Sequence, residues 1–246
     1  MRIALLGDVH GNQDLLEACV SAAAAAGLAA LIQLGDLGLT ASTWGPGRRR
    51  SRWPIPVLVI DGNHEDHAFL AEARASGLTT AWAAQGLVHQ PRGSSRCLDG
   101  RQVLFLGGAL HANRRQAEDG ANLIRAEDLA RALASAQAHP PAMIVSHSCP
   151  ANIGIGMHGN PALADSVHQH ILVAGHECGP PDDCGEPQLT ALWQALPRRP
   201  ALWCYGHFHI NHERLIGATR FIAVAAAGVG QMRIWDTRTM TVTAWG

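Results

Sequence analysis

The stretch IALLGDVHGN, residues 3–12, contains the features that decide the fold. Its apolar start, Ile3–Leu6, is typical of a buried strand, and the Gly-Asp pair after it is typical of a tight turn. Asn12 can cap a helix in which apolar residues recur at helical spacing until Gly27 ends it. The apolar run Leu31–Leu34 follows. The first 34 residues therefore predict a β-α-β unit.

Apolar runs of the same kind recur along the chain and predict further buried strands. They cover residues 57–60, 103–106, 143–145 and 202–205. Two more helices are expected between them, over residues 66–76 and 126–138. Strands that alternate with helices indicate a layered α/β fold. We expect one domain over residues 1–246, closed by an antiparallel meander of strands at 220–225, 232–235 and 241–244.

The composition is that of a folded protein without a strong electrostatic field. Hydrophobic residues make up 47% of the chain and charged residues 16%, which excludes a disordered chain, and no apolar run is long enough for a membrane helix. The net charge of −1 provides no general attraction for nucleic acid or lipid, so any phosphate site must be local.

The chain starts without an export signal and its cysteines form no C-x-x-C pair, so we expect a cytoplasmic protein with reduced thiols.

Polar side chains follow five of the six predicted strands directly. The motifs are Gly7-Asp8-Val9-His10, Gly35-Asp36, Gly62-Asn63-His64-Glu65, His147 and Gly206-His207-Phe208-His209. In an open α/β sheet, ligand sites lie outside the carboxyl ends of the strands, so these five loops should converge. Glycine in four of the motifs lets the backbone turn sharply and come close to a bound ion.

Seven of these side chains have the chemistry of metal ligands: Asp8, His10, Asp36, Asn63, His147, His207 and His209. The mixture of carboxylate, amide and imidazole suits Mn, Fe or Zn better than Ca or Mg. Seven ligands exceed the need of one ion. If one carboxylate bridges, two divalent ions can be held about 3.5 to 4 Å apart, as in enzymes that hydrolyse phosphate esters. One such motif alone is commonly a turn or a structural histidine, but five together predict a dinuclear site.

The five motifs, in this order, resemble the signature of the calcineurin-like metallophosphoesterases, and the resemblance spans residues 7–209. It implies a four-layer α/β/β/α sandwich built on two mixed β-sheets. It also implies how the ligands divide between two ions. One ion would be held by Asp8, His10, Asp36 and His209, and the other by Asp36, Asn63, His147 and His207, with Asp36 as the bridge.

The resemblance further implies hydrolysis of a phosphodiester or phosphomonoester by a hydroxide that bridges the two ions. His64 would protonate the leaving oxygen; the alternative is that it only orients Asn63. Asn12 and Arg114 are candidates for substrate binding. The segment around Arg114 resembles one that lines the pocket of small bacterial phosphoesterases, although a surface arginine is an equal alternative.

Small relatives of this kind act on nucleotides and related metabolites, and we expect a small phosphate ester as the substrate. A Ser/Thr protein phosphatase is one alternative, but Leu37–Thr40 and Asp66-His67 depart from the pattern of that family. A single-strand nuclease is another, in which Arg48–Arg52 would guide the nucleic acid instead of forming a solvated face. A non-catalytic metal-binding scaffold is the third alternative, and the complete ligand set argues against it.

Two long connections, residues 40–56 and 148–187, are expected to be lids or binding loops. The second contains His176, Cys178 and Cys184 around Asp182-Asp183. These side chains could ligate a structural ion, but a polar loop is the simpler interpretation because one loop would supply every ligand.

Overall fold

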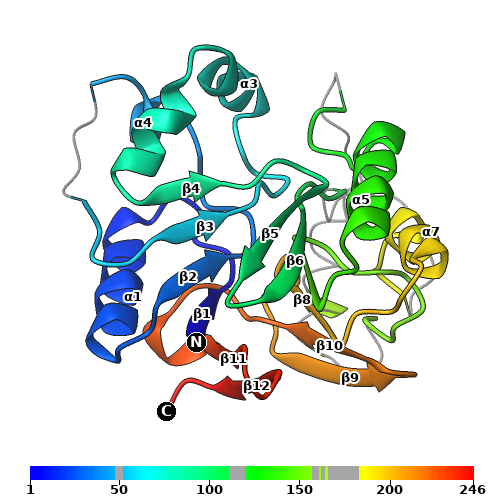
Figure 1. Cartoon of the computed structure of the whole chain (residues 1–246). Helices are drawn as coiled ribbons and strands as arrows, with labels where there is room; N and C mark the ends of the chain where they lie inside the picture. The colour runs from blue at the N-terminus through cyan, green and yellow to red at the C-terminus, as the bar shows by residue number, and fades with distance from the viewer. Residues whose placement is uncertain (48–51, 111–119, 157–160, 162–163, 166–182) are drawn as a thin grey trace.

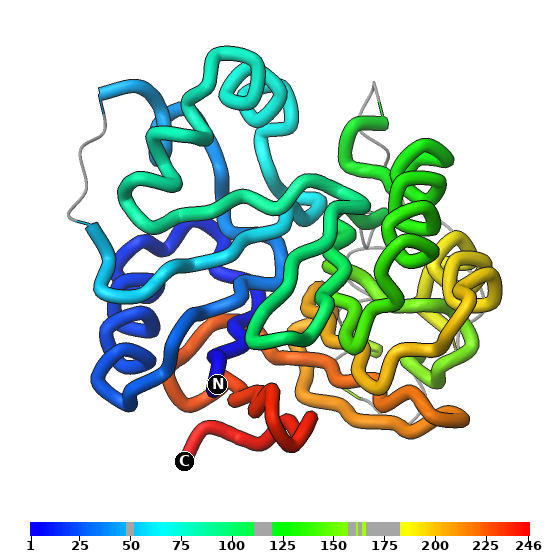
Figure 2. Tube along the Cα trace, in the orientation of Figure 1, coloured from blue at the N-terminus to red at the C-terminus, as the bar shows by residue number. Residues whose placement is uncertain are grey.

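Two six-stranded sheets pack face to face between two layers of helices (Figure 1). The computed structural model describes residues 1–47, 52–110, 120–156, 161, 164–165 and 183–246. Figure 2 shows how the chain is divided: the blue and cyan part builds one sheet, the green to orange part builds the other, and the red C-terminal part returns to the first. This architecture confirms the predicted four-layer α/β/β/α sandwich.

The first sheet contains β1 (Arg2–Leu6), β2 (Ala30–Gln33), β3 (Val57–Val59), β4 (Leu87–His89), β11 (Arg233–Asp236) and β12 (Thr241–Ala244). Its order is β12-β11-β1-β2-β3-β4. Strands β1 to β4 are parallel, with Ile3 opposite Ala30, whereas β11 pairs antiparallel with β1. The parallel half brings the carboxyl ends of β1, β2 and β3 to one edge.

The second sheet contains β5 (Ser94–Leu98), β6 (Arg101–Leu106), β7 (Met143–Ser146), β8 (Leu202–Tyr205), β9 (His212–Ile216) and β10 (Thr219–Ala223). Its order is β5-β6-β7-β8-β10-β9. The four inner strands are parallel and the two edge strands antiparallel, so this sheet is also mixed.

Helices cover the outer face of each sheet. On the first sheet lie α1 (Gln13–Ala25), α2 (Ala41–Trp44), α3 (His67–Ala75) and α4 (Leu78–Ala84), and on the second α5 (Ala126–Ala138) and α7 (Pro187–Ala195). A 3₁₀ turn, η2 (Val229–Gln231), precedes β11. In Figure 1, α1 lies on one side of the molecule and α5 and α7 on the other. None of the helices in the described part of the chain has the length and apolar character needed to cross a bilayer.

The alternation of side chains along each strand builds the layers. In β1, Ile3 and Leu5 belong to the core between the two sheets, whereas Ala4 and Leu6 belong to the core under the helices. Because successive side chains of a strand point to opposite faces, a strand buried on both faces must be apolar throughout. This explains why the inner strands are continuous apolar runs.

The predicted C-terminal meander is wrong. Strand β10 pairs with β8 and β9 in the second sheet, and β11 and β12 form a hairpin on β1 in the first. Residues 224–232 carry the chain from one sheet to the other. The turn predicted near residues 236–239 is present, since the Asp236 carboxylate accepts from the amides of Arg238 and Thr239.

Candidate metal centre

The loops that carry the five motifs leave the carboxyl ends of β1, β2, β3, β7 and β8. Four of the seven predicted ligands have a left-handed backbone, with φ of 50° at His10, 55° at Asp36, 67° at His207 and 55° at His209. This conformation costs free energy for residues other than glycine, and such strain gathers at functional sites. The backbone is therefore bent to aim these side chains.

Asp8, His10 and His209 form the first ligand group, with their ligand atoms within 4.8 Å of one another. The Nε2 atom of His209 lies 3.0 Å from Asp8 Oδ2 and 3.0 Å from His10 Nε2. The other oxygen of Asp8 accepts from the amide of His207 at 2.9 Å. Burial would raise the pKa of Asp8, but the hydrogen bond from His209 and the charge of His147 lower it, so this carboxylate stays ionised.

Asp36, His147 and His207 form the second group, again within 4.8 Å, and Asn63 adjoins them. His147 Nε2 lies 3.3 Å from Asp36 Oδ2 and 3.0 Å from Asn63 Oδ1. Burial would raise the pKa of Asp36, but the charge of His147 and its hydrogen bond lower it well below the usual range. Burial, followed by the charge of His147, lowers the pKa of His207 to about 3, so this ring is neutral and can act as a ligand.

The orientation of His147 is fixed by its other ring nitrogen. Nδ1 lies 2.7 Å from the carbonyl oxygen of Leu34, which can only accept, so Nδ1 carries a proton and donates it. Nε2 is then the nitrogen that faces the oxygens of Asp36 and Asn63. Burial would lower the pKa of His147, but the charge of Asp36 raises it to about 10, so Nε2 holds a proton here that a metal ion would replace.

Glycines allow the ligand loops to pack against one another. A Cβ atom at Gly62 would clash with Asp36, one at Gly206 with Asp8, and one at Gly35 with the His147 ring. The glycines that flank the motifs are therefore needed for close approach as well as for turning.

His64 lies at the rim of the centre. Its amide donates to Asp36 Oδ1 at 2.8 Å, and its ring packs edge-to-face on that of His10, with the centroids 5.4 Å apart. The side chain is exposed, whereas Asn63 beside it is buried. Of these two adjacent residues, Asn63 is therefore buried beside the candidate ligands, whereas His64 lies at the surface.

Glu65 is a buried residue of the site to which sequence reasoning gave no role, although it belongs to the third motif. Its carboxylate accepts from the amides of Leu37, Gly38 and Leu39, which follow Asp36, at 2.9, 3.0 and 2.6 Å. Burial and the charge of Asp36 raise the pKa of Glu65 to about 7, against the effect of these amides. The partners lie 26 to 28 residues away in the sequence, so no local pattern indicates them.

The ion pair of Asp61 and Arg92 is a second feature that the sequence does not indicate, and Asp61 precedes Asn63 by two residues. Arg92 donates from Nε to Asp61 Oδ2 at 2.7 Å, and its terminal nitrogens contact the same oxygen, Asp128 and the carbonyls of Ala121 and Leu123. Burial would raise the pKa of Asp61, but the charge of Arg92 lowers it far below the usual range. This ion network joins the end of β3 to the segment before α5.

Of the two candidates for substrate binding, the structure describes Asn12 but not Arg114. Asn12 is the N-cap of α1, and its Oδ1 accepts from the amide of Leu15 at 3.1 Å. Arg114 lies outside the described residues, as do Arg48–Arg50 of the arginine run; Arg52 is exposed.

The predicted alternative ion site at residues 176–184 also lies largely outside the described part of the chain, which includes neither His176 nor Cys178. Within the described part, Asp183 accepts from the amides of Asn152 and Gly185 at 2.7 and 3.1 Å. Cys184 donates its amide to the carbonyl of Ile155 at 2.7 Å. These contacts organise the loop itself.

Comparisons with known proteins concern the fold and the family. The crystal structure of TT1561 of Thermus thermophilus is similar in fold, with a TM-score of 0.62 over 98% of this chain and 96% of that one, at 15% identity. A putative 5'-nucleotidase from Staphylococcus aureus is similar over 99% of this chain and 52% of that one, with a TM-score of 0.53 and 14% identity. A search of curated proteins gives no match. The model of the family described as calcineurin-like phosphoesterase matches residues 1–211, and the chain therefore belongs to that family.

Proposed function

We propose that the protein is a two-metal phosphoesterase that hydrolyses phosphodiester or phosphomonoester bonds of nucleotides or related small metabolites. The observation that carries the proposal is the convergence of two ligand groups, Asp8 with His10 and His209, and Asp36 with His147 and His207. Both groups contain an ionised, buried carboxylate and imidazole nitrogens, which is the donor chemistry of Mn, Fe or Zn.

The donor set suits a pair of cations. His147 Nε2 faces the oxygens of Asp36 and Asn63, and His10 Nε2 faces His209 Nε2 at 3.0 Å beside Asp8. A proton or a metal ion must lie between such atoms, and the Asp36 charge that raises the pKa of His147 to about 10 attracts a metal cation as it attracts a proton. In the proposal Asp36 serves both ions, and Asn63 adds an amide oxygen to the second group.

Bound divalent ions would supply an acidified water and neutralise charge on the phosphoryl oxygens. The chain supplies the remaining steps. The Leu34 carbonyl holds the His147 ring in the orientation that ligation needs. His64, exposed beside buried Asn63, donates a proton to the leaving oxygen. Asn12 and Arg114 are retained as substrate-binding candidates, Asn12 because it is exposed at the start of α1.

A small ester is favoured over nucleic acid because the chain as a whole has a net charge of −1 and gathers polyanions weakly. A single-strand nuclease is therefore one alternative function, and a Ser/Thr protein phosphatase is the other.

The cytoplasmic location of the protein stays a prediction.

The test is an assay of Mn-loaded protein on bis-p-nitrophenyl phosphate, p-nitrophenyl phosphate and a phosphopeptide, with Asp36→Asn as the control. We expect hydrolysis of at least one of the small esters, little hydrolysis of the phosphopeptide, and no activity in the control. Absence of hydrolysis of all three substrates would show that the protein is not the proposed enzyme. An assay on an oligonucleotide at increasing salt concentrations distinguishes a nuclease from an esterase of small substrates, because nuclease activity would fall steeply with salt.

A further inference from the structure

The loop that carries Asp36 is held from both sides. On one side, the amides of Val9 and His10 donate to the carbonyl of Asp36 at 3.0 and 2.8 Å, and the amide of Gly11 donates to the carbonyl of Leu37 at 3.0 Å. These contacts tie the loop to the segment that carries Asp8 and His10. Its carbonyl groups are therefore fixed by the first motif.

On the other side, Glu65 holds the amide groups of the same loop. Its Oε1 accepts from Leu37 and, at 3.4 Å, from Gly62, while its Oε2 accepts from Gly38 and Leu39. Three successive amides thus point at one carboxylate, whose two oxygens accept all of these hydrogen bonds. If this acceptor were lost, buried N–H groups would lack a partner.

Glu65 is also the residue after His64 and the second after Asn63. Its backbone therefore belongs to the third motif, while its side chain accepts hydrogen bonds from the loop of the second motif. Both carboxylate oxygens are occupied by amides, and Glu65 is not a member of either ligand group. It therefore acts on the metal centre through the loop and not through contact with an ion.

We propose that Glu65 is a positioning residue that sets where Asp36 stands between the two ion sites, and thereby sets the affinity of the centre for metal. The inference rests on the proposed function, because it takes Asp36 as the bridging ligand. Gln at this position would keep the size but turn an N–H₂ group toward amides that need an acceptor, so the loop and Asp36 would have to shift.

The test is calorimetric titration of the metal-free protein with Mn²⁺, comparing wild type with Glu65→Gln and Glu65→Asp. Loss of an outer contact of this kind commonly weakens metal binding about 10- to 100-fold, and we expect that loss in Glu65→Gln. Glu65→Asp keeps the charge on a shorter side chain and should recover part of the affinity. Glu72→Gln makes the same change on the exposed face of α3 and should bind Mn²⁺ as wild type does.

Steady-state kinetics add a readout that a purely structural role would not move. Glu65→Gln should need more Mn²⁺ for half-maximal activity, whereas its KM for the ester at saturating Mn²⁺ should stay near the wild-type value. Equal Mn²⁺ affinity in folded Glu65→Gln and wild type would overturn the inference and leave the proposed function intact. If wild type binds no Mn²⁺, the proposed function itself fails. If Glu65→Gln does not fold, Glu65→Asp decides: weaker binding supports the role and equal binding overturns it.

Discussion

His64 differs from the candidate ligands around it because its ring is exposed while Asn63 is buried. We predict that His64→Ala retains the metal content of wild type but loses about 10²-fold or more in kcat, because a general acid commonly contributes that factor. The loss should be largest for esters with a poor leaving group, which need the proton most. Metal analysis and kcat on two esters of different leaving group measure this.

The control for this variant is His139→Ala, which removes an exposed histidine from the end of α5 and should leave kcat unchanged. If His64→Ala keeps near-normal turnover on both esters, His64 only orients Asn63. Loss of metal by His64→Ala would point to the same conclusion.

The glycines that pack against the carboxylates give a second prediction. Gly62→Ala and Gly206→Ala would push a methyl group into Asp36 and Asp8 respectively, so both should bind Mn²⁺ at least about tenfold more weakly. Gly230→Ala is the matched control, since a Cβ there meets nothing within 4 Å. Calorimetry on the three variants tests this, and wild-type affinity in Gly62→Ala would mean that the loops do not pack as described.

At the scale of elements, Arg92 joins the two sheets next to the site. It lies in the connection from β4 to β5, and its guanidinium contacts Asp61 after β3 and Asp128 in α5. We predict that Arg92→Met lowers the free energy of unfolding by about 3 kcal/mol, because the buried Asp61 carboxylate loses its closest charged partner and keeps only the longer contacts to Arg74 and His89, at 3.8 and 3.7 Å. Urea denaturation of the metal-free protein measures the change.

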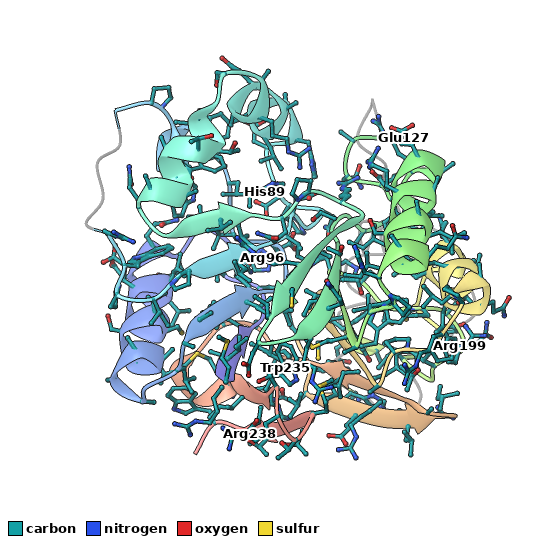
Figure 3. The ribbon with its side chains drawn as sticks, in the orientation of Figure 1. His89, Arg96, Glu127, Arg199, Trp235 and Arg238 are labelled. Atoms are coloured by element: carbon teal, nitrogen blue, oxygen red, sulfur yellow. The ribbon has the colours of Figure 1, made fainter. Side chains whose placement is uncertain are left out.

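Arg96→Met on β5 is the control for that experiment. Arg96 is exposed, and Figure 3 labels it together with His89, the last residue of β4. Its replacement should change the free energy of unfolding by about 0.5 kcal/mol or less. Equal stability of Arg92→Met and Arg96→Met would show that Asp61 does not depend on Arg92.

The elements that the sequence predicts correctly are those with a strong local signal. The helix at 126–138 and the strand at 202–205 match α5 and β8, and the apolar inner strands agree within a few residues. The sequence does not predict the edge strands β4, β5 and β9. Strand β4 has only three residues, and the residues of β5 and β9 are largely polar or exposed and carry no alternation. The sheet to which β10 belongs depends on where residues 224–232 cross, and no local pattern specifies this.

The residues of the site also divide into those with a local sequence signal and those without one. Asp8 and Asp36 could be predicted as candidate ligands because each follows an apolar strand within a glycine motif, a context visible in the sequence. Glu65 and Arg92 could not be assigned roles, because their contacts are with backbone and side-chain groups 26 to 36 residues away. The contacts of a residue that supports a candidate ligand through the tertiary fold have no fixed spacing in the sequence, so no motif identifies it.

At the scale of the whole molecule, the net charge of −1 conceals a local concentration of negative charge. Asp8 and Asp36 are buried and ionised, and bound cations would compensate them. We predict that Mn²⁺ at 100 times its dissociation constant stabilises the protein by about 2.7 kcal/mol per ion bound only to the folded state. Thermal unfolding with Mn²⁺ and after chelation measures this, and Asp36→Asn should show a much smaller shift. No shift in wild type would contradict the prediction.

We propose that seven side chains from five loops hold two metal ions, with Asp36 between them. Anomalous X-ray diffraction from crystals of the Mn-loaded protein tests this arrangement most directly. We expect two Mn peaks about 4 Å apart, one beside Asp8, His10 and His209, the other beside Asn63, His147 and His207, with Asp36 contacting both. A single peak, or peaks away from these residues, would contradict it.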